Sequence, residues 1–211
     1  MLVSDLVFPW FMCIFAAHYQ SVIVMSQFEY KPRVADGVLE KKLKSSGAVL
    51  VEGPKWCGKT TTSEQHAKSI NYISDPVNLN KNMILAEMNI SALLEGDKPK
   101  LLDEWQIIPQ LWDAVRFEVD HSKGIGQFIM TGSAVPPDKE KQAKIHHTGT
   151  GRITSLRMRP MSLWESGESS GEVSLANLFN NPGTPIYSES KFQLEQIAFL
   201  ICRGGWPIAT T

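Results

Sequence analysis

The sequence of 211 residues contains 21 Lys and Arg against 22 Asp and Glu, a formal net charge of -1, and 43% of its residues are hydrophobic. This composition excludes a disordered chain, and its overall charge gives no case for binding to nucleic acid or to an anionic membrane. Its three cysteines, Cys13, Cys57 and Cys202, form no C-x-x-C pair, which argues against a disulfide framework and a zinc site and fits a reducing compartment.

Residues 1–24 differ in composition from the rest of the chain. Residues 6–17 are almost wholly apolar, and Asp5 is the only charged residue of the segment. A signal peptide would begin with basic residues, and a membrane span would need about twenty apolar residues and no Pro9. We favour translated upstream sequence before a true start at Met25, with a membrane anchor as the alternative.

An amphipathic helix is predicted at residues 33–46, where apolar residues recur at helical spacing beside charged ones. Gly47 is suited to end this helix. The short apolar run at residues 47–52 then predicts a buried parallel strand. This strand leads directly into a glycine-containing loop.

The loop follows the pattern G-x-x-x-x-G-K-[ST], the Walker A motif, in which backbone N–H groups face phosphate oxygens. Lys59 would bring its charge to the β- and γ-phosphates, and the Thr60 hydroxyl would complete a Mg²⁺ shell. A helix predicted at residues 60–69 would point its positive end at the same phosphates. Cys57 has no thiol nearby, so we interpret it as a packed small residue rather than a redox centre. The expected nucleotide-binding residues are Gly53, Pro54, Lys55, Trp56, Cys57, Gly58, Lys59, Thr60 and Thr61.

A second acidic motif follows in the predicted order of strands and helices. A strand is predicted at residues 70–73 and a helix at residues 79–94, broken near Asn89. The next apolar pair ends in Asp103 and Glu104. Asp103 would hold Mg²⁺ directly or through water, and Glu104 would polarise the attacking water as a general base. Acidic pairs at strand ends are usually only solvated, but the place of this pair after the glycine loop favours the functional interpretation.

Beyond this motif a helix is predicted at residues 109–123, opened by a proline, and a buried strand at residues 126–130. Thr131 and Ser133 follow that strand, where a hydroxyl would either bond the γ-phosphate or the attacking water, or cap a turn. Residues 138–147 predict a basic helix, which is more simply a solvated face than a nucleic-acid surface. Its two histidines have no companions at metal-ligand spacing.

The remaining sequence predicts a last strand at residues 153–158, a short helix beginning at Met161 and a final amphipathic helix at residues 190–202. Residues 166–171 and 180–185 are rich in linker and turn residues.

From Met25 onward the chain resembles the prokaryotic AAA-type ATPases with an AAA_14 domain, which usually carry a DUF4143 domain after it. The matching segments occur in the family's order: Glu52-Gly-Pro-Lys-Trp-Cys-Gly-Lys-Thr-Thr61, Leu101-Leu-Asp-Glu-Trp-Gln106, Thr131-Gly-Ser133, Gly151-Arg-Ile153, Arg159-Pro-Met-Ser-Leu-Trp-Glu165 and Gly204-Gly-Trp-Pro207. The resemblance implies a P-loop NTPase, a three-layer α/β/α fold with a five-stranded parallel sheet in the order 5-1-4-3-2. It also implies that Thr131 or Ser133 acts as sensor 1 and makes Arg152 an arginine-finger candidate, the alternative being a surface arginine that pairs with a nearby carboxylate.

Three segments are therefore expected: a hydrophobic leader at 1–24 outside the fold, an ATPase core at 25–165, and at 166–211 a linker with the helical start of a C-terminal or lid region. Two departures from the family stand out, because the leader has no counterpart and the chain stops where such proteins continue. A lid, a sensor 2 arginine and any effector module therefore cannot be located in this sequence.

The expected activity is Mg-dependent ATP hydrolysis by a cytoplasmic motor or switch, with ATP and Mg²⁺ as cofactors. Its partner is open: a second copy in a homo-oligomer, or DNA or a protein bound through the absent C-terminal region, with a membrane only if the leader is genuine. The alternative is a non-hydrolysing ATP-dependent scaffold or DNA-associated switch. A nucleoside kinase is disfavoured, because no acceptor pocket or Arg-rich lid is evident.

Overall fold

The computed structural model describes residues 29–132 and 148–210, of which Pro32–Thr210 form one compact unit. The expected leader at 1–24, the basic helix at 138–147 and Ser133 lie outside the described residues. Among the described helices, none has the length and apolar content that crossing a membrane requires.

A parallel sheet lies at the centre of the unit. In the described residues it has five strands in the order β2-β3-β4-β1-β5, and each neighbouring pair is parallel. This is the predicted order 5-1-4-3-2 counted from the other edge, so the predicted fold is confirmed. The strands are β1 (Ala48–Glu52), β2 (Ser69–Tyr72), β3 (Lys100–Asp103), β4 (Phe128–Gly132) and β5 (Ile153–Arg157).

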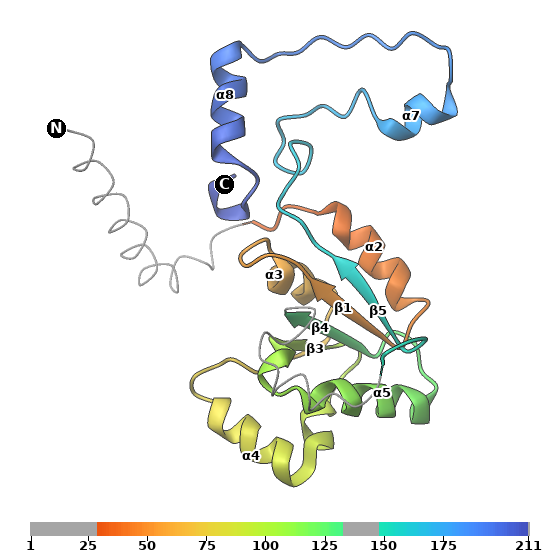
Figure 1. The fold of residues 1–211 in the computed structure, drawn as a ribbon, viewed down its shortest axis with the longest axis vertical. Coiled ribbons are helices and arrows are strands. Elements are labelled where there is room, and N and C mark those ends of the chain that lie inside the picture. Colours follow the sequence, from red (N-terminus) through yellow and green to blue (C-terminus); the bar gives the residue numbers. More distant parts are fainter. Residues whose placement is uncertain (1–28, 133–147, 211) are drawn as a thin grey trace, which may run out of the picture. The chain divides into compact units, whose positions relative to one another are not determined.

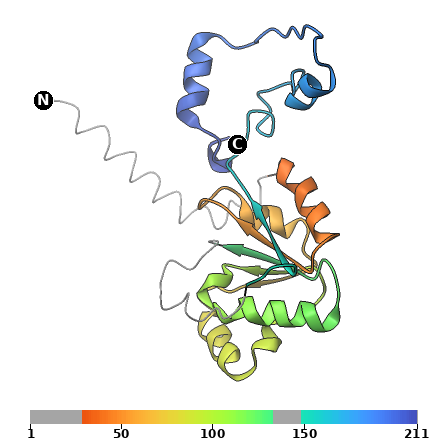
Figure 2. The ribbon, with the colours of Figure 1, turned by 45° about the vertical axis from the view of Figure 1, so that its right-hand side comes forward.

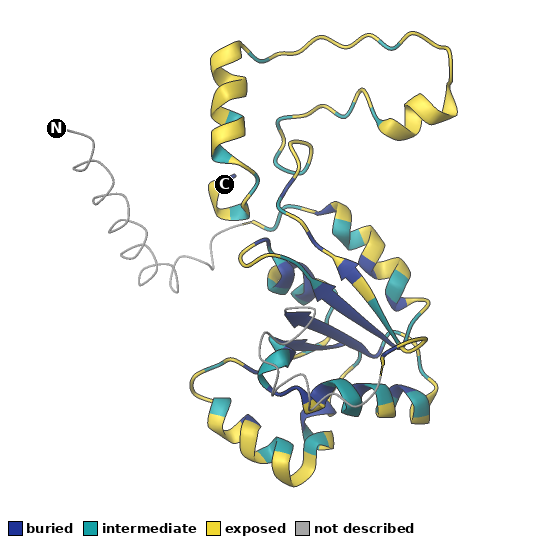
Figure 3. Cartoon of the chain, viewed as in Figure 1, coloured by how far each residue is buried: buried dark blue, intermediate teal, exposed yellow. Residues whose placement is uncertain are grey.

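The sheet is covered on both faces, with α2 on one side and α5 on the other (Figure 1, Figure 2). Alternate residues of β1 point to opposite faces, as the period of a strand requires. Val49 and Val51 pack in the cluster that includes Leu39 of α2, whereas Leu50 packs in the cluster that includes Leu111 of α5. Burial on both faces explains the consecutive apolar residues 48–51 of β1 and 128–130 of β4 (Figure 3).

The helices follow the predicted sequence with shifted ends. They are α2 (Val34–Leu43), α3 (Lys59–Glu64), α4 (Leu79–Asn89), η2 (Ile90–Leu94), η3 (Trp105–Ile107), α5 (Gln110–Ser122), α7 (Leu175–Asn180), α8 (Leu194–Arg203) and η4 (Pro207–Ala209). The helix predicted to run to Ser69 ends at Glu64, because Ser69 already pairs with Lys100 in the sheet. The break expected near Asn89 is present, since α4 changes there to the 3₁₀ helix η2.

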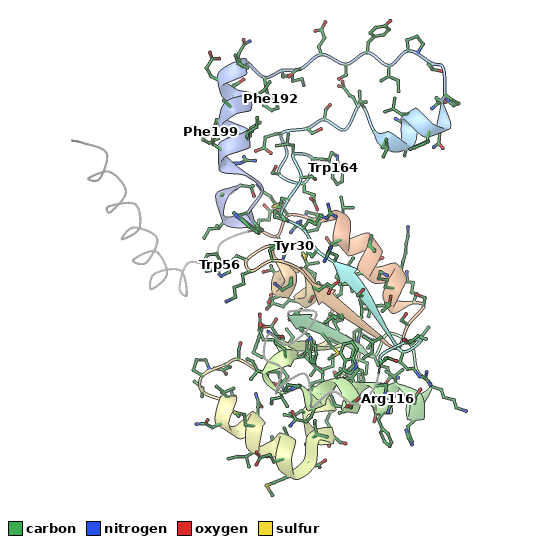
Figure 4. All side chains as sticks on the ribbon, viewed as in Figure 1. Tyr30, Trp56, Arg116, Trp164, Phe192 and Phe199 are labelled. Carbon is green, nitrogen blue, oxygen red and sulfur yellow. The ribbon has the colours of Figure 1, made fainter. Side chains whose placement is uncertain are left out.

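The prediction of a short helix from Met161 was wrong. The segment forms turns instead, because the Glu165 carboxylate turns back and accepts hydrogen bonds from the backbone N and the hydroxyl of Ser162. Helix α7, capped by Ser174, has no counterpart among the predicted elements. Neither α7 nor α8 buries a residue, and Phe199 of α8 is 63% exposed (Figure 3, Figure 4).

Candidate nucleotide site

The glycine loop connects the carboxyl end of β1 to α3, as its spacing predicts. Gly58 directly precedes α3 with φ 97°, a left-handed conformation that favours glycine. Gly53 lies so close to the chain after β5 that a Cβ atom there would be 2.4 Å from the carbonyl oxygen of Met158. Both glycines of the motif are therefore required by the path of the backbone.

The expected nucleotide-binding residues divide into an exposed tip and a buried base. Pro54, Lys55 and Trp56 are exposed, and the Trp56 ring projects from the loop with 75% of its surface exposed (Figure 4). Cys57 is buried, and this burial raises the pKa of its thiol. The thiol is thus protonated at neutral pH, which supports the packing role and not a redox one.

Lys59, the first residue of α3, folds back over the loop. Its Nζ donates to the carbonyl oxygens of Gly53, at 3.0 Å, and of Pro54, at 2.9 Å. The side chain is largely buried, so its ammonium group is held within the curve of the loop. A cation in this position lies where the loop would hold an anion.

Two motifs far apart in the sequence meet at Asp103. Thr60 Oγ1, on α3, donates to Asp103 Oδ1 at 2.7 Å, and Thr131 Oγ1 at the end of β4 donates to the same oxygen at 2.5 Å. Asp103 is 6% exposed and Thr131 is fully buried. The carboxylate is thus fixed by hydroxyl groups from the P-loop helix and from a neighbouring strand.

Glu104 occupies an unusual backbone conformation, with φ 58° and ψ 44°. A non-glycine residue there costs on the order of 1–3 kcal/mol and persists only where its surroundings hold it. The backbone N of Glu104 donates to Thr131 Oγ1, at 3.3 Å, and its carboxylate accepts from Gln106 Nε2. Gln106 can approach because position 132 is a glycine, where a Cβ would lie 1.8 Å from Gln106 Oε1.

The oxygens at this edge suit a magnesium ion. Mg²⁺ in nucleotide sites takes one or two protein oxygens and completes its shell with phosphates and waters. The Thr60 hydroxyl and the Asp103 carboxylate supply such a pair, already in contact. In the described part of the chain no group of three or more His, Cys, Asp or Glu could hold a metal by itself.

Arg152 is the expected site residue that the fold does not bring to this edge. It precedes β5, and its carbonyl accepts from the N of Ala48 at the start of β1, the end of the sheet opposite the loop. Its Nε forms an ion pair with Asp120 Oδ1 at 2.6 Å. The hydrogen bond from Arg152 is the main cause that lowers the pKa of Asp120.

Arg33 and Glu165 are contributors to the site that the sequence did not reveal. Arg33 precedes α2 and donates to the carbonyl oxygen of Cys57 in the loop, and its Nε pairs with Glu165 at 3.0 Å. They are separated by 132 residues, so no local pattern connects them. The only signal was that Glu165 belongs to one of the six segments that match the family.

The family comparison covers this edge of the sheet. A family model described as an AAA domain, AAA_14, matches residues 45–166, more than half of the chain. The matched span contains the glycine loop, the Asp103-Glu104 pair and Thr131. No curated protein matches the chain.

Proposed function

This chain belongs to the AAA_14 family of AAA domains, a family of nucleotide-binding ATPases, and on that premise we propose that it binds and hydrolyses Mg-ATP at the edge formed by Lys59, Thr60, Asp103 and Glu104. The observation that carries the proposal is the contact of 2.7 Å between Thr60 Oγ1 and Asp103 Oδ1, which joins the two motifs in one site.

In this proposal Lys59 exchanges its two carbonyl partners for phosphate oxygens, whose negative charge is a stronger partner for an ammonium group. The backbone N–H groups of residues 53–61, of which Pro54 has none, would bind the phosphates, and the start of α3 would add its positive end. Thr60 and Asp103 would hold Mg²⁺, which neutralises charge on the transferring phosphoryl group.

Glu104 would act as the general base. The strained backbone of Glu104 fixes the direction in which its carboxylate points from the end of β3. The Gln106 amide further restrains one oxygen of this carboxylate. The carboxylate would orient the attacking water and take up its proton. Thr131 holds both Asp103 and the backbone of Glu104, so as the sensor 1 candidate it would act by positioning these two residues.

Phosphate release by the full chain tests this proposal directly. With Mg-ATP, the wild-type chain is expected to release phosphate and a folded Lys59→Ala chain to release none above background. The matched control is Lys41→Ala, which removes an exposed lysine on α2 outside the loop and should release phosphate like the wild type. Calorimetric titration separates the alternatives. Binding without hydrolysis would favour the ATP-dependent switch or scaffold, and absence of binding by the wild-type chain would overturn the site.

A further inference from the structure

Arg33 carries a positive charge into the interior, with 7% of its surface exposed. Its guanidinium group contacts three separate segments at once. Nη1 donates to the carbonyl oxygen of Cys57 at 3.0 Å, Nη2 donates to the carbonyl oxygen of Arg159 at 2.8 Å, and Nε pairs with Glu165. The planar fork of an arginine suits three acceptors in fixed directions, which a lysine ammonium does not.

Both carboxylate oxygens of Glu165 accept hydrogen bonds. One carboxylate oxygen accepts from Arg33 Nε at 3.0 Å and from the backbone N of Val34 at 2.8 Å, and the other accepts from the N of Ser162 at 2.7 Å. The two charged side chains are 5% and 7% exposed. A buried ion pair contributes little net stability compared with apolar packing, so the geometry it imposes is its distinctive contribution.

The contact with Cys57 has a consequence for the neighbouring peptide. In a trans peptide the C=O and N–H groups lie in one plane and point in opposite directions. Because Arg33 holds the Cys57 carbonyl, the N–H of Gly58, which belongs to the same peptide, faces away from Arg33. Gly58 starts the turn into α3, where N–H groups would meet the phosphates.

The Cys57–Gly58 peptide could also rotate easily, so that its C=O and N–H groups exchange directions. Gly58 has no Cβ and a φ of 97°, so steric barriers to rotation beside it are small. A reversed peptide would present the Cys57 carbonyl oxygen to the phosphates in place of an N–H group, exchanging attraction for repulsion. Arg33 opposes this reversal from two anchors outside the loop, Glu165 and the carbonyl of Arg159.

We propose that Arg33, anchored by Glu165, is a positioning residue that fixes the Cys57–Gly58 peptide with its N–H group toward bound phosphates. The inference rests on the proposed function, because it concerns how the same loop recognises a nucleotide. It assigns to Arg33 no contact with the nucleotide itself. Its effect on binding therefore falls on the phosphates and not on the base or the ribose.

Competition binding on the full chain tests this, with Mg-ATP and inorganic triphosphate as the two probes. Arg33→Gln is expected to weaken both probes by about 10-fold or more, the range for a hydrogen bond from a charged group, and by the same factor. Arg33→Lys keeps the charge without the fork and is expected to remain weakened. Glu165→Gln frees the anchor and should weaken both probes to a smaller extent.

The matched control is Arg116→Gln, which breaks a partly exposed ion pair with Asp120 within α5 and is expected to leave both affinities unchanged. Circular dichroism establishes that each chain is folded, and Arg33→Lys and Glu165→Gln carry the test if Arg33→Gln does not fold. Folded variants that bind both probes like the wild type would overturn the inference. A loss confined to ATP would overturn it too, since Arg33 would then act on the nucleoside. A wild-type chain that binds neither probe would instead overturn the proposed function.

Discussion

The hydroxyl group of Thr60 lies 2.7 Å from Asp103 Oδ1, so the two residues that would bind magnesium are in direct contact. The same oxygen accepts a second hydrogen bond from Thr131. Two hydroxyl donors on one carboxylate oxygen fix the direction of the carboxylate. The acidic group at the end of β3 is therefore oriented before any ligand arrives.

Asp103→Asn tests whether this carboxylate binds the metal. An asparagine oxygen can still accept from Thr60 and Thr131, so the local geometry is expected to be retained while the charge is lost. Affinity for ATP in the presence of Mg²⁺ should fall on the order of 10-fold or more, whereas affinity measured with a chelator should change little. Calorimetric titrations under the two conditions give both numbers. Equal losses with and without Mg²⁺ would contradict the metal role.

Glu104→Gln is expected to leave ATP binding nearly intact and to slow hydrolysis by on the order of 10²-fold or more, as for a lost general base. The amide has nearly the shape of the carboxylate but takes up no proton. Single-turnover phosphate release measures the effect. Glu118→Gln, a half-buried carboxylate on α5, is the matched control and should hydrolyse like the wild type. Normal hydrolysis by Glu104→Gln would mean that the base lies elsewhere.

Tyr72 predicts a distinct alkaline transition. Partial burial first, and then the hydrogen bond that the phenol donates to Glu64, raise the pKa of Tyr72 to about 12, although 42% of the residue's surface is exposed. A raised pKa means that the neutral phenol is favoured in the folded state, so this contribution to stability is complete below about pH 10 and is lost as pH rises through about 12. Ultraviolet titration should reveal a late-ionising tyrosine that Tyr72→Phe removes. If Tyr72→Phe retains the late-ionising tyrosine and loses one that ionises at ordinary pH, the environment assigned to Tyr72 is wrong.

Variants of Arg152 distinguish a chain that binds nucleotide on its own from an ATPase that works as an assembly of copies. In its own chain it pairs with Asp120 at the end of the sheet opposite the loop, so a role as arginine finger requires the site of a neighbouring copy. Arg152→Ala should then bind ATP but hydrolyse it far more slowly, and Asp120→Ala, which frees the same arginine, should not.

Mixing supplies the second half of this test. Arg152→Ala combined with Glu104→Gln should recover some phosphate release, because some interfaces would join an intact base to an intact arginine. No recovery at any mixing ratio, with each variant inactive alone, would contradict a finger acting between copies. Equal and small effects of Arg152→Ala and Asp120→Ala would indicate a surface ion pair only.

The parts of the site that could be predicted are those that depend on residues close together in the sequence. The glycine spacing fixes Gly53, Gly58, Lys59 and Thr60 relative to one another, and a parallel sheet brings the ends of neighbouring strands to one edge, so Asp103 followed. Arg33 could not be predicted, because its partner Glu165 lies 132 residues away and an arginine before a helix carries no local signature.

Two misplaced elements have the same origin. The helix after the glycine loop was predicted to be too long, because its last residues are compatible with a helix. Ser69 instead pairs with Lys100 in the sheet. The helix expected at Met161 was lost because the backbone N and the hydroxyl of Ser162 donate hydrogen bonds to the Glu165 carboxylate, which Arg33 holds in place. In both cases tertiary contacts outweighed local propensity.

Because Cys57 is buried under the glycine loop, the rate at which its thiol reacts with a reagent would report how often the loop opens. Its Sγ would lie 3.2 Å from a Cβ at Gly53, so the sulfur sits under the first glycine of the motif, whereas Cys202 on α8 is exposed. An alkylating reagent can reach Cys57 only while the loop is open, but reaches Cys202 at all times. The ratio of the two alkylation rates, read from peptide masses, would thus time the opening of the loop, and a bound nucleotide should slow the first rate alone.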